Sequence, residues 1–341
     1  MSSTCRSSRA PTRCTAAPSS SSRNSKFDEN NYFNDLAGRP KPDFSQHQYG
    51  GTISGPIVKD KTFYFFDYQG YHVNQGASYL STVPSAKMRA GDFSELNRVI
   101  YDPITHLPFP GNVIPASRFD PAAKNILNQM IPEADTAGTR SATGQTINNY
   151  LINPTLERQD NQIDLKVDHS LTSNNRFFGR YSYEKTHRVL PATLPHGDAG
   201  FTFGAGEGDI KAQGFAFNDT HTLSSNLLNE FRVGWSSIKF FMTPIDYGTN
   251  PAQAVGIPGI NLGPTTSGMS QIMFNNGGMR NIGANSNQPL ITNQNDIQIF
   301  DNVTQGGGQA HGQGAAAATR TARARFSTPT RSSDGSTSTR T

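Results

Sequence analysis

The chain has 341 residues, of which 34% are apolar, 10% aromatic and 16% charged, and its formal net charge is +4. An apolar share this far below the roughly 45–50% of ordinary globular domains argues against a compact soluble core. No run approaches the about 18 consecutive apolar residues that a membrane-spanning helix requires, and the N-terminus lacks the apolar region of a secretory signal peptide.

The two ends differ in composition from the body. Residues 1–23 contain no acid and no large aliphatic residue, and residues 306–341 have Phe326 as their only large apolar side chain. Such segments cannot bury enough surface to offset their ordering entropy, so both are predicted to be disordered. We interpret both as out-of-frame or chimeric translation.

These flanks also determine the sign of the net charge. They hold nine of the 30 basic residues and one of the 26 acids, which leaves the body, 24–305, with 21 bases, 25 acids and a charge of −4. The flanks contain no lysine and no interleaved aromatic residues. Nucleic-acid binding is therefore not predicted.

The body contains three predicted β-hairpins, each with a short polar break between two extended runs. They pair 49–58 with 61–71, 161–170 with 176–185, and 213–222 with 227–240. A seventh strand signal, 295–303, has no readable partner.

The connections alternate in length. The breaks inside the hairpins have two to five residues, whereas long gaps cover about 72–160, 186–212 and 241–294. This alternation is typical of outer-membrane barrels, in which periplasmic turns are short and extracellular loops are long. A ten-residue strand tilted by about 45° spans ~23 Å, close to the ~25 Å apolar band. The predicted fold is mainly β: an antiparallel transmembrane β-barrel fragment of about seven strands. A soluble β-sandwich or solenoid stays open as an alternative.

Two-residue alternation predicts one face of the strands in water and one in lipid. The candidates for the lumen-facing side are Asp164, Lys166, Asp168, Arg180, Glu184, Glu230 and Arg232. The candidates for the lipid-facing side or an aromatic girdle are Phe177, Tyr181, Tyr183, Phe231, Val233 and Trp235.

No constellation predicts catalysis, a metal or a cofactor. Asp168, His169 and Ser170 have the residue types of a hydrolase triad, but neighbours on a strand point to opposite faces. The eight histidines show no short-spaced pair, and both cysteines, Cys5 and Cys14, lie in the N-terminal flank. The glycines of 50–55 lack the lysine of a phosphate-binding loop and are interpreted as sites of close strand packing. We therefore predict no enzymatic activity.

Several segments together resemble a known family. They are RNSKFDENNYF (23–33), QHQYGGTISGPIVKDKTFYFFDYQGY (46–71), TVPSAKMRAGDFSEL (82–96), IYDPITHLPFPGNVIPASRFDPAAKNIL (100–127) and ERQDNQIDLKVDHSLTSNNRFFGRYSY (157–183). These runs resemble the barrel of Oar-like TonB-dependent transporters, which are abundant in acidobacteria, and the resemblance covers about 23–304.

The resemblance implies an outer-membrane barrel of about 22 strands. It also implies an internal plug, often a carboxypeptidase-regulatory-like domain, and a drive from the TonB–ExbB–ExbD complex. The chain departs from that pattern: it has no signal peptide, TonB-contact segment or plug, and it ends in Thr341 rather than an aromatic residue. We expect a fragment of an outer-membrane transporter for a large or scarce substrate, in contact with outer-membrane lipid and non-functional alone. The alternatives are a soluble or surface-attached β-rich adhesin, and a barrel-embedded hydrolase, which the missing constellation disfavours.

Overall fold

The computed structural model describes most of the chain. The described ranges are 13–36, 38–194, 205–274, 279–285, 288–306 and 318–328, and for 318–328 only the backbone is described.

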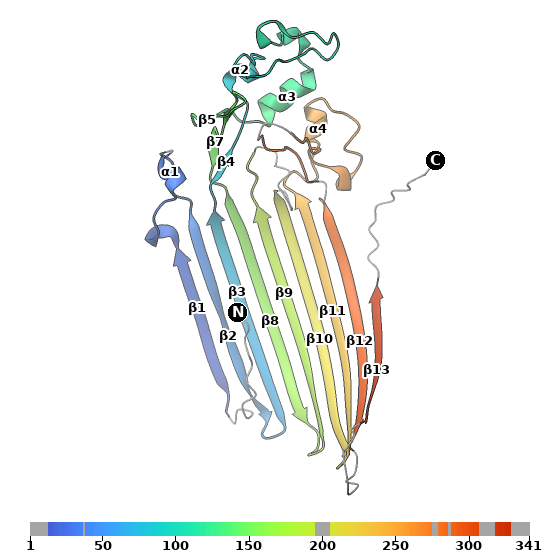
Figure 1. Ribbon diagram of the computed structural model, residues 1–341. Coiled ribbons are helices and arrows are strands. Elements are labelled where there is room, and N and C mark those ends of the chain that lie inside the picture. The colour runs from blue at the N-terminus through green and yellow to red at the C-terminus, as the bar shows by residue number, and fades with distance from the viewer. Residues whose placement is uncertain are drawn as a thin grey trace, which may run out of the picture.

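One antiparallel sheet dominates the molecule (Figure 1). Within the described ranges it has nine strands, each paired with its neighbours in chain order. They are β1 (Thr15–Asn24), β2 (Phe44–Val58), β3 (Thr62–Gly76), β8 (Thr155–Ser170), β9 (Asn175–Leu190), β10 (Gly206–Ser224), β11 (Leu227–Pro244), β12 (Leu290–Gln305) and β13 (Ala318–Thr328).

All three predicted hairpins are present. Their turns lie at 59–61, 171–174 and 225–226, at the lower end of the sheet in Figure 1. Residue Asp60 takes a positive φ of 57° in the first turn, a conformation that Asp adopts more readily than most residues. The predicted strand without a partner, 295–303, lies inside β12 and pairs with β11 on one side and β13 on the other.

The strands are longer than the sequence pattern predicted. Strand β8 has 16 residues and β10 has 19, where about ten were expected for each. At ~3.3 Å per residue and a tilt of ~45°, 16 residues rise by ~37 Å, which exceeds the ~25 Å apolar band of an outer membrane. The polar ends had escaped prediction because the apolar alternation stops before the hydrogen-bonded ladder does.

The flanks differ from the predicted disorder where the structure describes them. Strand β1 covers 15–24 and pairs with β2, and strand β13 covers 318–328 and pairs with β12. An edge strand can be held by backbone hydrogen bonds alone, so low apolar content does not exclude it. These two strands raise the expected seven to nine, and the rest of both flanks lies outside the described residues.

The long connections contain the remaining elements, gathered above one end of the sheet (Figure 1). They are η1 (Ser25–Phe27), α1 (Tyr32–Leu36), β4 (Tyr79–Ser81), α2 (Ala86–Arg89), η2 (Pro110–Asn112), η3 (Ala116–Arg118), α3 (Pro121–Gln129), β5 (Thr139–Arg140), β6 (Thr146–Ile147), β7 (Tyr150–Ile152), α4 (Pro251–Ala254) and η4 (Pro264–Thr266). Helix α3 begins where the Asp120 carboxylate accepts a hydrogen bond from the Ala123 backbone N–H and Pro121 occupies the first helical position.

A core of buried apolar side chains lies among these loops and not behind the sheet. Its members are Val83, Met130, Ile131, Leu194, Ala252, Val255, Met269 and Ile282. They come mainly from the β3–β8 connection, 77–154, and the β11–β12 connection, 245–289. We call these two connections together the loop cap.

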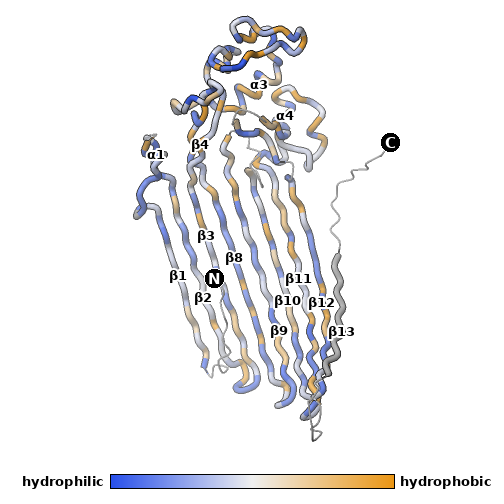
Figure 2. The backbone as a smooth tube through the Cα atoms, in the orientation of Figure 1, coloured by the Kyte–Doolittle hydropathy of each residue, from blue (hydrophilic) through white to orange (hydrophobic). Residues whose placement is uncertain are grey.

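Along the strands, by contrast, hydrophilic and hydrophobic residues alternate in short intervals (Figure 2). Both faces of the sheet are partly exposed, and Phe215, Leu165 and Ile297 each leave more than 40% of their surface open. A search of the described residues finds no helix with the length and apolar character needed to cross a membrane.

Candidate functional site

The register of the sheet sorts the predicted site residues onto two faces. Residues opposite each other in paired strands point the same way, as do residues two apart along one strand. Thus Asp164 faces Ser182 and Lys166 faces Arg180. Following these pairs, one face carries all seven lumen candidates: Asp164, Lys166, Asp168, Arg180, Glu184, Glu230 and Arg232. The other carries all six lipid or girdle candidates: Phe177, Tyr181, Tyr183, Phe231, Val233 and Trp235. We call these the polar face and the aromatic face.

Ion pairs connect most of the charged residues on the polar face. The Asp164 carboxylate accepts hydrogen bonds from the Arg180 guanidinium at 2.7 Å, from the Ser182 hydroxyl and from the Gln162 amide at 3.1 Å. Lys166 pairs with Asp168 at 2.8 Å. Asp164 is only 8% exposed, so its network is the most enclosed of these pairs.

A second network on the polar face joins β10 and β11. The Arg232 guanidinium pairs with Glu230 at 3.0 Å and donates to the Asn218 side-chain oxygen at 2.9 Å. Charged groups bonded in this way, along a strand or across one, hold a polar lining in a fixed geometry. Glu184, the remaining lumen candidate, is exposed on the same face.

Sequence reasoning missed several polar-face residues because it had no register. Asp67 lies directly opposite Asp164, which brings two carboxylates from β3 and β8 together. Asp296 of β12 lies opposite Ser236 of β11. The alternation within each strand already indicated their face, but only the pairing of the strands places them beside the predicted residues.

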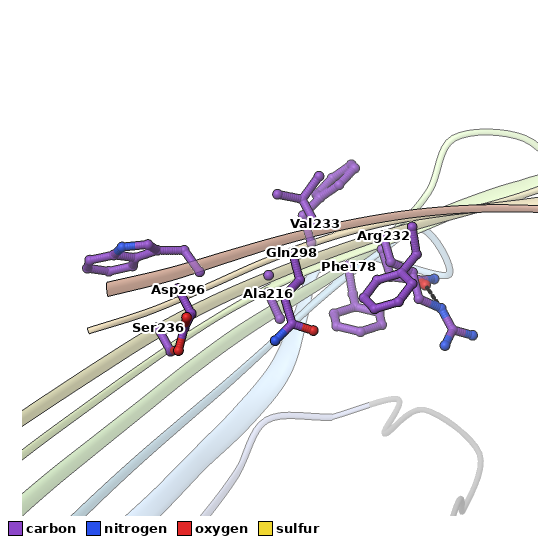
Figure 3. Close-up of a pocket in the computed structure, with 12 residues that line it drawn as sticks. Phe178, Ala216, Arg232, Val233, Ser236, Asp296 and Gln298 are labelled. Atoms are coloured by element: carbon purple, nitrogen blue, oxygen red, sulfur yellow. Dashed lines mark hydrogen bonds between the residues drawn. The ribbon is translucent and has the colours of Figure 1, made fainter. Parts of the chain in front are cut away.

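A shallow depression of about 560 Å³ lies over β9 to β12. Figure 3 shows Phe178, Ser236, Asp296 and Gln298 on one side of the ribbons and Val233 on the other. The lining of the polar side is therefore mixed, with aromatic and amide groups beside charged ones. Such a surface can contact polar solutes through hydrogen bonds and apolar ones through the rings.

The aromatic face presents large side chains in rows across the strands. Leu165, Tyr181, Phe215, Trp235 and Ile297 lie opposite one another in a single row from β8 to β12. The described part of the chain places no folded layer over this row. A contiguous exposed apolar surface of this kind marks contact with a membrane or with another protein.

The triad-type residues do not assemble. Asp168 lies on the polar face, bonded to Lys166 at 2.8 Å, whereas His169 lies on the aromatic face and bonds Thr62 at 2.9 Å. A search of the described residues finds no group of three His, Cys, Asp or Glu side chains placed to hold a metal ion. Gly50 fits the close-packing interpretation, because a Cβ there would lie 2.2 Å from the Tyr68 carbonyl oxygen.

The loop cap has its own polar and apolar features. Asp102 accepts a hydrogen bond from the Ile104 backbone N–H at 2.8 Å and pairs with Arg118 at 2.8 Å, and these interactions, the backbone bond first, lower the pKa of its carboxyl group. A cavity of about 610 Å³ lies beside α3, and its lining is almost wholly apolar, including Met88, Phe93, Ile126, Leu127, Ile257 and Ile272.

A comparison with protein families decides the class of the molecule. A family model described as an outer membrane beta barrel domain matches residues 21–329. The chain belongs to this outer membrane β-barrel family. The match spans β2 to β13 and the loop cap, so the family covers both the sheet and the loops above it. A comparison with curated proteins found no match.

Membership of the outer membrane β-barrel family explains the two faces. A barrel strand in an outer membrane alternates between an apolar outer side and a polar inner side, and its closed ladder removes the edges that lipid does not tolerate. The hairpins, the mainly β composition and the barrel class predicted from the sequence are confirmed.

Proposed function

We propose that this chain forms part of the wall and the outer loops of a TonB-dependent transporter of the Oar-like type. The observation that carries the proposal is the combination of barrel-family membership with a folded loop cap over one end of the sheet. The segments that resemble Oar-like transporters lie in this wall and in this cap, including 46–71, 82–96 and 100–127.

In this proposal the polar face lines the interior and the aromatic face meets lipid. The paired charges of Asp164, Arg180 and Arg232 then provide a hydrated, fixed lining along the substrate path. The long loops lie outside the cell, where a large or scarce substrate first contacts the protein. Energy for transport comes from the TonB–ExbB–ExbD complex acting on the intact protein.

The open edges of the sheet support the view that further strands complete the wall. Within the described residues, β1 and β13 each pair on one side only. An unpaired edge exposes backbone donors and acceptors that lipid cannot satisfy. We therefore propose that the chain acts as part of a larger barrel and does not transport alone.

Two measurements test this function. Reading the DNA on both sides of the coding region in all frames is expected to reveal plug-coding sequence upstream and further strand-coding sequence downstream. After expression, the full chain is expected to fractionate with membranes and to need detergent for extraction. A chain that is soluble and folded without detergent would contradict the proposal and favour the adhesin alternative.

A further inference from the structure

Three lysines form a single row on the aromatic face near its loop-cap end. Lys185 of β9 lies opposite Lys211 of β10, which lies opposite Lys239 of β11. Neighbouring strands lie about 4.8 Å apart, so the row brings three ammonium groups within a width of about 10 Å. All three side chains are exposed.

Like charges placed directly opposite each other destabilise a sheet, so such a row needs a compensating anion. None of the three lysines forms an ion pair in the part of the chain that the structure describes. Lys211 lies over the Tyr183 ring at 5.5 Å, which orients it without neutralising it.

The row also lines a depression. A hollow of about 320 Å³ is bounded by all three lysines together with Asp209, Phe241 and Ile291. Asp209 is the one acid in this lining, and its carboxylate bonds the His187 ring at 3.0 Å. The lining therefore carries two net positive charges beside two apolar side chains that are 42% and 49% exposed, Phe241 and Ile291.

The position of the row along the strands indicates what occupies it. Lys239 lies four residues from Trp235 on the same strand and face, about 13 Å toward the loop cap. Lipid headgroups lie at the boundary of an apolar band, and basic side chains there attract anionic ones. An apolar wall next to the charges suits the start of an acyl chain.

We propose that Lys185, Lys211 and Lys239 bind the phosphate group of an anionic lipid on the outer surface of the barrel. This inference rests on the proposed function, because it requires the aromatic face to meet lipid. The phosphate oxygens accept hydrogen bonds from the three ammonium groups, and the acyl chains extend down the aromatic rows. Free phosphate would satisfy the charges but would not use Phe241 and Ile291, so the site is assigned to a lipid.

The test uses the fluorescence of the full chain in dodecyl maltoside micelles. Trp235 is the only tryptophan in the sequence, so quenching by lipids with brominated acyl chains reports on lipid beside this face. Brominated phosphatidic acid is expected to quench at an about five- to tenfold lower mole fraction than brominated phosphatidylcholine. The combined variant Lys185→Gln, Lys211→Gln and Lys239→Gln is expected to lose this preference.

A matched control separates a specific site from general charge. Lys59→Gln, Lys61→Gln and Lys124→Gln together remove the same charge from three other exposed lysines and are expected to keep the preference. A triple Lys→Arg variant at the row, which preserves charge, is also expected to keep it, and Lys211→Gln alone replaces the triple Gln variant if that one loses its β-type circular dichroism.

Each contrary result overturns a defined statement. Equal loss of preference in the row and control variants, or no preference in the original chain, overturns the lipid site. Displacement of phosphatidic acid by millimolar inorganic phosphate at constant ionic strength also overturns it, because free phosphate would then be the ligand. If neither brominated lipid quenches Trp235, the assignment of the aromatic face to lipid fails, and the proposed function fails with it.

Discussion

Asp164 and Asp168 lie on the same strand and the same face, yet their surroundings differ. The Asp164 side chain is 12% exposed and accepts bonds from three side chains, whereas the side chains of Asp168 and its partner Lys166 are each 37% exposed. An enclosed carboxylate loses more when its charge is removed, because solvent cannot replace the lost partners.

We therefore predict different costs for the same substitution. Asp164→Asn should lower the free energy of unfolding by about 1–3 kcal/mol, and Asp168→Asn by less than about 1 kcal/mol. Urea unfolding of the full chain in micelles, followed by circular dichroism, measures both. Equal costs would show that the Asp164 network does not contribute as its geometry indicates.

Asp102 in the loop cap gives a prediction about pH. Because its pKa is lowered in the folded loop, its ion pair and backbone bond stabilise the loop above the ordinary carboxyl range. That contribution is lost as the pH falls from about 4 through the lowered pKa. Hydrogen exchange of residues 100–107 should accelerate over this interval.

The variant Asp102→Asn checks the cause. It should exchange faster than the original chain at pH 7 and show a weaker acceleration below pH 4. Glu133→Gln, at an exposed position of the same connection, serves as the control and should behave like the original. An unchanged pH profile in Asp102→Asn would assign the acid sensitivity elsewhere.

At the scale of elements, the loop cap and the sheet are held together in different ways. The cap has a buried apolar core, while the sheet is held by its ladder and by cross-strand contacts. Core substitutions in the cap should therefore loosen it and leave the strands paired.

Met269 and Leu262 provide a matched pair within the β11–β12 connection. Met269 is 1% exposed and Leu262 is 82% exposed. Met269→Ala should reduce the stability of the cap by about 2–5 kcal/mol, whereas Leu262→Ala should have little effect. Limited proteolysis in micelles should show faster cleavage within 245–289 for Met269→Ala only. Equal cleavage of the two variants would mean that the cap lacks a cooperative core.

The elements also show where sequence reasoning succeeds and where it stops. Alternation in 161–185 indicated both the strands and their faces, because the side-chain period is a local property. The partner of 295–303 was not readable, since pairing across the 245–289 connection depends on tertiary contacts. Strands β1 and β13 escaped prediction because Ser, Arg and Ala carry little strand signal. The lysine row required the register of three strands, which no single segment encodes.

At the scale of the whole molecule, the sheet is a curved wall with two open edges. Because an open edge is costly in lipid, we predict that the full chain alone forms no pores. A liposome-swelling assay on the refolded chain should give the rate of empty liposomes. Swelling that depends on the sugar size would show that the chain closes a barrel by itself.

The central claim is that the aromatic face meets apolar surroundings and the polar face meets water. Trp235 and Ser236 are neighbours on β11 and point to opposite faces. Moving the only tryptophan by one residue, with Trp235→Phe and Ser236→Trp, therefore transfers the fluorescent probe from one face to the other.

The most direct measurement compares quenching of these two chains in micelles by brominated dodecyl maltoside and by aqueous iodide. Trp235 should be quenched strongly by the brominated detergent and weakly by iodide, and the tryptophan at position 236 should show the reverse. Strong iodide quenching at position 235 with weak quenching at 236 would contradict the assignment of the two faces.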